Sequence, residues 1–338
     1  MKILVTGAAG FLGSILTERL LARGEKDIRV FIRPGPKRAK LEAIAARYPD
    51  ANVEFFTGNL ISAPDCARAV AGVDTVYHLA AAMSGAAADM FLHTVVASKY
   101  LLDAIAAQGR PIRTVLVSSF SVYGVASLGR RARVDEKTPL EPHPERRDLY
   151  AQAKLRQEKL FWEYREKYGI PVTVLRPGVI YGPGAKPFSN RIGLNLFGLF
   201  LHLGGRNHLP LTYVENCADA ILTAGSRPEA EGEVYNVVDD DLPTCSEFLK
   251  TYRREVERLR VIRMPYFATM MMSRAVERYH HWSKGQLPAV FTPYKTASMW
   301  AGNTFSNAKL KSLGWKPHVA THDAIRHALK SYKASLGS

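Results

Sequence analysis

The 338-residue sequence predicts an α/β fold, in which a doubly wound parallel sheet carries helices on both faces and a smaller lobe lies toward the C-terminus. Three observations predict this fold. The chain opens with a short apolar run, KILVTG (2–7), that ends in a glycine turn. Strand-like apolar runs then alternate with helical periodicity, which is typical of a parallel sheet. A hydrophobic content of 47% is sufficient for a sizeable core.

Each element follows from its local pattern. Helical periodicity after the first strand ends at Gly24, a residue suited to close a helix. The other strands are short apolar runs, and the other helices are stretches with helical periodicity. We expect strands at 2–7, 28–33, 52–59, 74–81, 113–120, 171–178 and 232–238, and helices at 11–24, 39–48, 65–73, 90–109 and 145–168.

The first turn carries the motif TGAAGFLG (6–13), with Gly7, Gly10 and Gly13 between a strand and a helix. The first glycine allows a tight turn, the second lets the backbone approach a pyrophosphate, and the third allows close helix–strand packing. The helix N-terminus offers N–H groups to phosphate. In a βαβ unit this motif predicts a dinucleotide-binding site, and therefore a Rossmann-type sheet.

The end of the second strand predicts which dinucleotide binds. An acidic residue there would accept a hydrogen bond from the ribose 2′-hydroxyl of NAD. This chain instead has Arg33, followed by Lys37 and Arg38. Because arginine binds a phosphate well, we predict NADP(H) rather than NAD(H). The alternative is a solvated loop whose charge is incidental.

Tyr150 and Lys154 stand four residues apart in a predicted helix, so their side chains share one face. This pair alone does not establish chemistry, because the spacing occurs by chance in many helices. Upstream, VSSFSVYG (117–124) ends a strand in serines. A hydroxyl there could hold a substrate oxygen beside the tyrosine, or it could only cap a turn.

Taken together, the motifs resemble the extended short-chain dehydrogenase/reductase family over essentially the whole chain, and the resemblance predicts an enzyme. They occur in the family's order: TGAAGFLG, GNL (58–60), HLAA (78–81), VSSFSVYG, YAQAK (150–154), LRPGVIYGPG (175–184) and SNAKLKSLGWKP (306–317). The resemblance implies that Tyr150 is the general acid/base at the reacting oxygen. It also implies that Lys154 binds the nicotinamide ribose and that Ser119 holds the reacting oxygen, with Ser118 and Ser121 as lesser candidates.

A free tyrosine has a pKa of about 10. We therefore expect the Lys154 ammonium and the positive nicotinamide to lower the pKa of Tyr150. The cofactor enables hydride transfer and the protein orients it.

The resemblance also places cofactor contacts at the glycine turn and at strand ends: Gly7, Gly10, Phe11, Leu12, Gly13, Arg33, Lys37, Asn59, Leu60, Leu79, Ala80, Ala81, Ser118, Tyr150, Lys154, Pro177, Gly178, Val179 and Ile180. Substrate contacts are expected at Met83, Ser121, Tyr181 and Asn190. Thr94 departs from the family's usual Asn, which leaves the position of the helix at 90–109 less defined.

Two departures bear on the substrate. Nucleotide-sugar epimerases of the family usually carry Asn at the position of Val179, and arginine at the position of Leu209 to bind a diphosphate. The stretch 205–221 looks more like the 3β-hydroxysteroid and sterol-4-carboxylate dehydrogenase branch. We therefore predict an NADP-dependent oxidoreductase that interconverts a hydroxyl and a ketone on an apolar, lipid- or steroid-like substrate. Met270–Met272 could line its pocket or could belong to the core.

Two other functions stay open. A nucleotide-sugar epimerase, dehydratase or reductase would need another diphosphate ligand, for which Arg191, Arg206 and His208 are candidates. A cofactor-binding regulatory protein without catalysis is disfavoured, because Ser119, Tyr150 and Lys154 are all present.

The alternation of strands and helices loosens past residue 185. We expect an NADP-binding domain at 1–185, whose sheet also receives 213–238, and a substrate-binding lobe built from 186–212 and 239–338. Three cysteines without C-x-x-C spacing argue against disulfides and against a metal site. With no secretory leader, a cytoplasmic protein is expected.

A net charge of +15 favours anionic ligands, and we expect no nucleic-acid partner because no such motif is present. The basic segment 250–284 could contact an anionic membrane surface or could be a solvated face. The family resemblance implies a homodimer formed through the helices at 90–109 and 150–168.

Overall fold

The computed structural model describes residues 1–35, 38–185, 189–196, 198–283 and 292–336. Its centre is a seven-stranded sheet in which every strand pair is parallel. The strand order is β12-β7-β5-β4-β1-β2-β3. The strands are β1 (Lys2–Thr6), β2 (Asp27–Ile32), β3 (Asn52–Thr57), β4 (Thr75–His78), β5 (Arg113–Val117), β7 (Val172–Pro177) and β12 (Val234–Val237).

The order of the strands reverses between β1 and β4, with Val5 paired to Val30 of β2 on one side and to Tyr77 of β4 on the other. Ligands of open parallel sheets bind at such a switch point, beyond the carboxyl ends of the strands. This topology confirms the predicted Rossmann-type fold.

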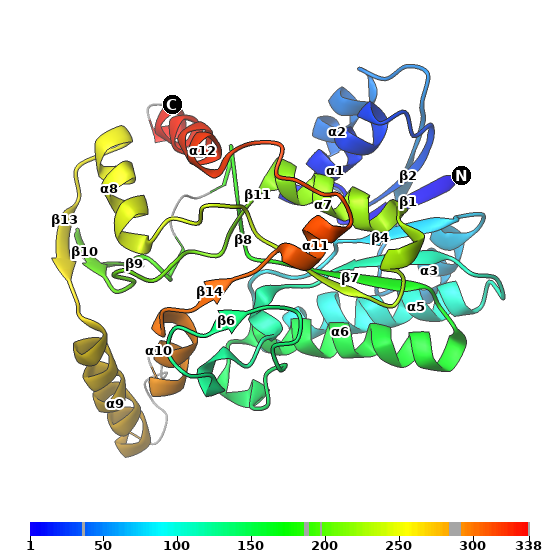
Figure 1. Cartoon of the computed structure of the whole chain (residues 1–338). Coiled ribbons are helices and arrows are strands. Elements are labelled where there is room, and N and C mark those ends of the chain that lie inside the picture. The colour runs from blue at the N-terminus through cyan, green and yellow to red at the C-terminus, as the bar shows by residue number, and fades with distance from the viewer. Residues whose placement is uncertain (36–37, 186–188, 197, 284–291, 337–338) are drawn as a thin grey trace.

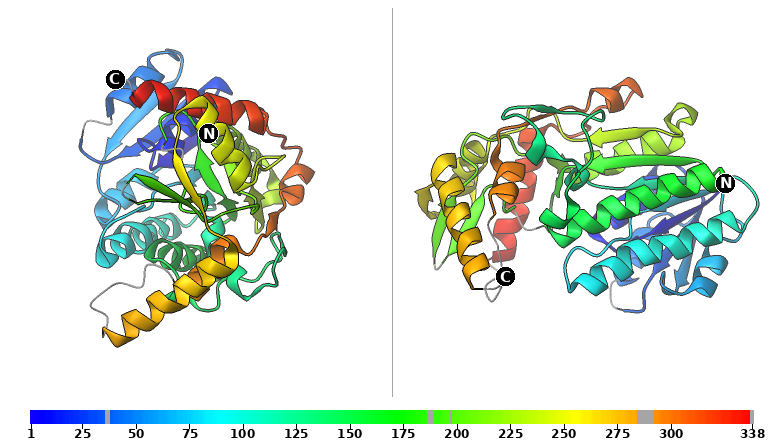
Figure 2. Two further views of the ribbon diagram at one scale, coloured as in Figure 1. Left: turned by 90° about the vertical axis from the view of Figure 1, so that its left-hand side faces the viewer. Right: turned by 90° about the horizontal axis from the view of Figure 1, so that it is seen from below.

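Helices cover both faces of the sheet, and each face has its own apolar core (Figures 1 and 2). One face carries α1 (Phe11–Ala22), α2 (Arg38–Ala45) and α7 (Val214–Ser226). The other carries α3 (Ala63–Val70), α5 (Ala97–Ala106) and α6 (Leu149–Tyr168). The strands pack apolar side chains on both faces, so they read as nearly continuous apolar runs in the sequence.

Some element boundaries differ from the predictions. The helix predicted at 145–168 begins at Leu149, because the Asp148 side chain caps it by accepting a 3.0 Å hydrogen bond from the Ala151 N–H. The helix predicted at 90–109 is split into α4 (Ala87–Phe91), a π-helical turn over Leu92–Val96, and α5. Thr94 lies in that turn and its Oγ1 accepts a hydrogen bond from the Ala82 N–H, which anchors the segment.

The C-terminal lobe, as the term is used below, comprises the elements of residues 189–212 and 239–336 that lie outside the main sheet (Figure 1). Its three-stranded sheet has the order β13-β10-β9, and α8 and α12 share a core with it. Two further strand pairs are β8 with β11 and β6 with β14.

The bounds of these elements are β6 (Arg133–Val134), β8 (Val179–Tyr181), β9 (Gly193–Leu196), β10 (Leu199–His202), β11 (Leu211–Tyr213), α8 (Cys245–Glu255), β13 (Arg260–Arg263), α9 (Tyr266–Trp282), α10 (Pro293–Trp300), β14 (Thr304–Phe305), α11 (Ala308–Ser312) and α12 (Thr321–Leu336). Of the segment 213–238, β12 enters the main sheet and α7 covers its face. The predicted domain boundaries and the substrate-binding role of the lobe stay predictions.

Candidate active site

The glycine turn between β1 and α1 leaves no room for side chains. Gly7 has φ +71°, and a Cβ there would lie 2.9 Å from the Ala80 nitrogen. A Cβ on Gly13 would lie only 2.1 Å from the Gly7 carbonyl oxygen. Gly10 begins α1 without a side-chain cap, and the first turn carries no acidic residue. The Gly10 N–H donates to the Gly7 carbonyl at 2.9 Å, and the first N–H groups of α1 lie at a helix N-terminus, which suits an anion such as a pyrophosphate.

The predicted cofactor residues of β4 lie beside this turn. Leu79, Ala80 and Ala81 follow β4 and are half-buried, and the Leu79 N–H donates to the Thr6 carbonyl. Phe11 is half-buried and Leu12 is buried in the first turn of α1. The fold therefore gathers these residues at the switch point of the sheet.

Arg33 follows β2 directly and is exposed. Among the residues that the structure describes, it forms neither a hydrogen bond nor an ion pair. Arg38 differs, because its guanidinium donates to Glu42 at 2.7 Å and lies 5.0 Å from the Phe55 ring centre. Arg33 is thus a described cation at this edge that is free to bind a phosphate, while Lys37 lies outside the described residues.

Asn59 and Leu60 follow β3. The main-chain N–H of Asn59 donates to Asp65 at 2.8 Å, and its side-chain oxygen accepts from the Ile61 N–H. Leu60 packs against the core on the α3 side of the sheet. These contacts hold the loop, and they leave the exposed Asn59 at the surface next to β2.

Ser119 and Tyr150 come together as predicted. The Ser119 side chain is buried after β5 and is hydrogen-bonded to the Tyr150 side chain, which begins α6. Burial raises the pKa of Tyr150, whereas the Ser119 hydrogen bond opposes that shift. Within the protein alone the pKa of Tyr150 is thus raised, and the lowering expected from the Lys154 ammonium stays a prediction. The contribution of the nicotinamide stays a prediction.

Lys154 is buried and its ammonium points to two oxygens. It donates to the Val117 carbonyl at 2.8 Å and to the side-chain oxygen of Gln157 at 2.9 Å. Burial lowers the pKa of Lys154 to about 7, and nearby Glu158 opposes this shift. Sequence reasoning missed Gln157, although its position three residues after Lys154 places it on a neighbouring part of the same helix face.

Ser118 is a predicted cofactor contact, but its hydroxyl is hydrogen-bonded to another side chain of the protein. It is buried and donates to Glu158 at 2.5 Å. Glu158 also forms a buried ion pair with Arg176 of β7, whose guanidinium lies 4.7 Å from the Tyr123 ring centre. The Ser118 side chain is thus part of a polar network inside the protein.

The segment after β7 is held by main-chain contacts. The Gly178 N–H donates to the Val237 carbonyl, and a Cβ on Gly178 would lie 2.1 Å from the Pro210 oxygen. Val179 and Ile180 then pair with β11 and are half-buried. Pro177 to Ile180 thus run from the end of β7 along β11.

The four predicted substrate residues differ in their surroundings. Met83 is 72% exposed and Asn190 is exposed. The Ser121 hydroxyl is buried without a hydrogen-bond partner in the described chain. The Tyr181 ring is buried 5.5 Å from that of Tyr213, and burial raises its pKa. Their role in substrate binding stays a prediction.

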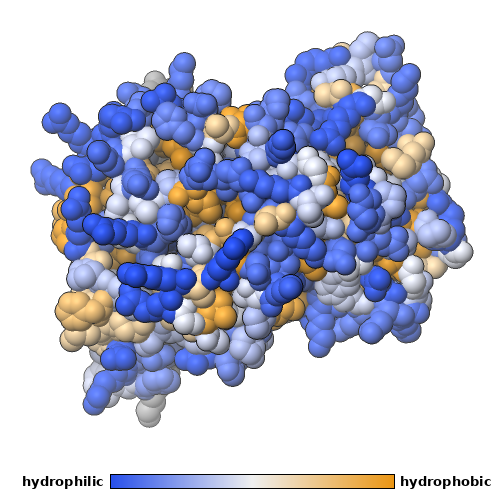
Figure 3. All heavy atoms as spheres, viewed as in Figure 1, coloured by the Kyte–Doolittle hydropathy of each residue, from blue (hydrophilic) through white to orange (hydrophobic). Residues whose placement is uncertain are grey.

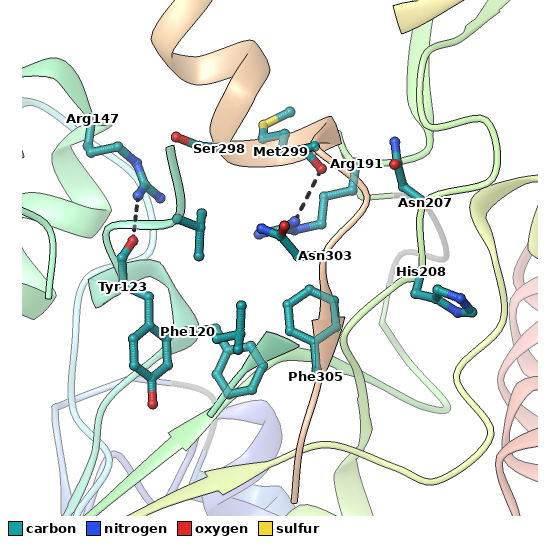
Figure 4. Close-up of a pocket in the computed structure, with 13 residues that line it drawn as sticks. Phe120, Tyr123, Arg147, Arg191, Asn207, His208, Ser298, Met299, Asn303 and Phe305 are labelled. Carbon is teal, nitrogen blue, oxygen red and sulfur yellow. Dashed lines mark hydrogen bonds between the residues drawn. The ribbon is translucent and has the colours of Figure 1, made fainter. Parts of the chain in front are cut away.

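A pocket lies between the segment after β5 and the C-terminal lobe (Figure 4). It is lined by Phe120, Tyr123, Val125, Val134, Arg147, Arg191, Asn207, His208, Ser298, Met299, Ala301, Asn303 and Phe305. Arg147 is neutralised by Glu141 at 2.9 Å. Arg191 donates to the Met299 carbonyl at 3.4 Å and has no carboxylate partner in the described ranges. Burial and nearby Arg147 lower the pKa of Arg191 to about 10.

Comparisons with known proteins agree with this geometry. The model of the NAD dependent epimerase/dehydratase family matches residues 3–237. The chain is 34% identical over 257 residues to an uncharacterized UDP-glucose epimerase, YtcB, of Bacillus subtilis, covering 70% of this chain and 76% of the relative. It is 27% identical over 358 residues to a 3-beta-hydroxysteroid dehydrogenase of Mycolicibacterium neoaurum, covering 98% of this chain and 91% of the relative.

The fold is also that of a solved structure, the UDP-glucose 4-epimerase of Thermus thermophilus in complex with NAD. The TM-score is 0.70 at 23% identity, and the alignment covers 99% of this chain and 100% of that chain.

Proposed function

The chain belongs to the NAD-dependent epimerase/dehydratase family, and from this premise we propose that it is an NADP(H)-dependent oxidoreductase of an apolar substrate. The proposed reaction interconverts a hydroxyl group and a ketone on a lipid- or steroid-like compound. That the protein is an NAD(P)-dependent enzyme of the extended short-chain type follows from the family itself.

The choice of an apolar substrate rests on the residue at position 209, which is Leu209. Nucleotide-sugar epimerases of the family usually carry a diphosphate-binding arginine at this position. Here the leucine is fully buried in the apolar core of the C-terminal lobe. A leucine cannot pair with a diphosphate, and the apolar side chains of that core surround it. The nearly full-length similarity to a 3-beta-hydroxysteroid dehydrogenase supports the same choice.

The catalytic residues fit this reaction. Tyr150 would exchange a proton with the substrate oxygen, and Ser119, which is hydrogen-bonded to Tyr150, would hold that oxygen. Lys154 would bind the ribose of the nicotinamide half and add positive charge beside the reacting oxygen. When bound, the nicotinamide supplies or accepts the hydride.

The preference for NADP(H) rests on Arg33. The side chain is exposed at the end of β2 and is not neutralised by a described carboxylate. No acidic residue occupies the position that would accept a hydrogen bond from the 2′-hydroxyl of NAD. A guanidinium at this place favours the 2′-phosphate.

The first experiment is to purify the protein, identify any retained cofactor, and titrate it with NADPH and NADH. We expect exchangeable binding with NADPH favoured by about tenfold, or about 1.4 kcal/mol. A panel of keto-steroids and long-chain keto-lipids would then be reduced with NADPH. Stoichiometric NAD that survives purification, together with no turnover on the panel, would refute the proposal.

One observation favours a second candidate, an enzyme of nucleotide sugars. Arg191 is a half-buried arginine without a described carboxylate partner, and it lines the pocket together with His208. The similarity to a UDP-glucose epimerase is also the higher of the two identities. If this candidate is right, UDP and UDP-sugars bind in calorimetry and Arg191→Met abolishes that binding. Unchanged binding of UDP to this variant would argue against a diphosphate site at Arg191.

A further inference from the structure

Helix α9 (Tyr266–Trp282) buries two small polar residues and exposes three large apolar ones. Thr269 and Ser273 are buried, and Ser273 shares a hydrogen bond of 2.6 Å with Thr296 of α10. On the opposite side Phe267 is 67% exposed, Met271 is 60% exposed and Trp282 is 77% exposed. The apolar stripe of a surface helix usually faces the core, so three large exposed apolar side chains depart from the usual pattern.

Large apolar side chains are also exposed on the small sheet of the same lobe. Leu196 of β9, Leu199 of β10 and Ile262 of β13 are all exposed. The views in Figures 1 and 2 show α9 projecting away from the main sheet. Figure 3 shows apolar atoms at the lower left, where α9 lies, beside strongly hydrophilic ones. A group of large apolar side chains on a projecting helix indicates an interaction surface.

The same face of α9 is basic. Arg274 and Arg278 occupy helical positions between Phe267 and Trp282 on the outward side, and both are exposed. Neither forms an ion pair with a described carboxylate. Over residues 250–283 the sequence has eight lysines and arginines against three glutamates. One of these glutamates, Glu255, is already paired with Arg254 at 2.8 Å.

Further unpaired arginines lie at the amino end of α9. An open hollow there is lined by Arg206 and Arg263, together with Met264 and Pro265. Within the described chain neither guanidinium has a carboxylate partner. Glu247, which also lines the hollow, is occupied by the helix cap of α8, where it accepts a 2.7 Å hydrogen bond from the Thr244 N–H. The hollow therefore suits an anionic group.

We propose that α9 is an interfacial helix that docks the protein onto an anionic membrane surface. Phe267, Met271 and Trp282 enter the boundary between headgroups and acyl chains, while the arginines contact lipid phosphates. A second copy of the chain is a poorer occupant, because two such basic faces would repel each other. No helix in the described ranges is long and apolar enough to cross a membrane, so the docking is peripheral. This inference goes beyond the proposed function and does not depend on the substrate.

The first test follows tryptophan fluorescence of the full-length protein with lipid vesicles. The chain has four tryptophans. Trp300 and Trp315 are 2% exposed and Trp162 is half-buried, which leaves Trp282 as the strongly exposed one. We expect a blue shift on vesicles of phosphatidylcholine with about one-third phosphatidylglycerol, and little change with phosphatidylcholine alone. Trp282→Phe should bind these vesicles but lose the blue shift.

The second test measures vesicle binding by co-sedimentation. Arg274→Ser with Arg278→Ser should weaken binding to the anionic vesicles by about tenfold, and Phe267→Ser with Met271→Ser should do likewise. The matched control, Lys26→Ser with Arg110→Ser, removes the same charge at the opposite, amino-terminal end of the sheet strands and should bind as the wild type does.

Three outcomes would overturn the proposal. The wild type could stay in the supernatant with every vesicle, or all variants could bind equally. In the third, the wild type does not bind vesicles but forms a dimer in sedimentation velocity, and the Phe267→Ser/Met271→Ser variant is a monomer. A second copy of the chain would then cover this face.

Discussion

The Lys154 ammonium donates a hydrogen bond of 2.9 Å to the side-chain oxygen of Gln157, one helical turn further along α6. The amide nitrogen of Gln157 donates in turn to Ser98 at 2.8 Å and to the Ala80 carbonyl at 3.4 Å. Gln157 therefore connects the catalytic helix with α5 and with the loop after β4, where the cofactor is expected. It has no exposed surface.

We expect Gln157→Leu to weaken NADPH binding by about tenfold, because the buried ammonium of Lys154 would lose an acceptor and shift position. Fluorescence titration of NADPH measures this. Gln157→Glu keeps the acceptor oxygen and should retain most of the affinity. Gln152→Leu, on the same helix, is the control, since the Gln152 amide donates to the Arg147 carbonyl and not to a described cofactor loop. Equal affinities for Gln157→Leu and the wild type would contradict the positioning role.

Tyr150→Phe should lower turnover by about a thousandfold, because the proton-transferring hydroxyl is removed. Cofactor affinity should change little. The measurement compares single-turnover hydride transfer with NADPH binding for the two proteins. Tyr168→Phe, at the exposed end of the same helix, is the control and should be fully active. An active Tyr150→Phe would mean that the proton comes from another group.

Arg33→Ser should reduce the preference for NADPH over NADH by about tenfold, through loss of the 2′-phosphate ligand. The affinity for NADH should stay the same. Arg38→Ser removes a neighbouring guanidinium that is already held by Glu42 and Phe55, and it should leave the preference intact. If the two variants behave alike, the charge of the loop and not Arg33 itself determines the preference.

Acid should destabilise the protein through His78. This ring is fully buried, shares hydrogen bonds with Thr6 and Ser98, and its pKa is lowered from 6.5 to about 3 by burial and by Lys154. Between these pH values the unfolded chain binds more protons than the folded one. The free energy of unfolding should therefore fall as the pH falls below 6.5, by up to about 1.4 kcal/mol per pH unit from this group.

Urea unfolding at pH 7 and pH 5 measures this slope. His78→Gln should be less stable at pH 7, because it disturbs the hydrogen bonds to Thr6 and Ser98. Its free energy of unfolding should, however, fall less between pH 7 and pH 5 than that of the wild type. An unchanged loss over that interval would show that other groups control acid unfolding.

The buried Glu158–Arg176 ion pair should be sensitive to removal of one partner. Arg176→Met leaves the Glu158 carboxylate buried and should lower the free energy of unfolding by about 3–5 kcal/mol. Arg156→Met breaks an exposed pair with Glu163 and should change it by less than about 1 kcal/mol. Urea unfolding compares the two variants. If Arg176→Met does not fold, Arg176→Lys is measured in its place. A similar small effect for both pairs would show that Glu158 is protonated or rehydrated at low cost.

The homodimer and the four substrate residues stay predictions. By contrast, the sequence alone determined the sheet and the nucleotide turn. Alternating apolar and periodic runs specify strands and helices by local spacing, and Gly7 and Gly13 are required by backbone geometry that no other residue tolerates at those distances. Tyr150 and Lys154 share a helix face for the same local reason.

Only the tertiary structure decided what the buried polar groups bind. Ser118 meets Glu158, Gln157 meets Ser98, and Arg191 is left without a described carboxylate partner. These relationships join segments that are distant in the sequence, and they depend on which side chains packing brings within hydrogen-bond distance. Likewise, the outward face of α9 could not be read from its sequence, since a helix with apolar residues on several sides does not specify which side its neighbours cover.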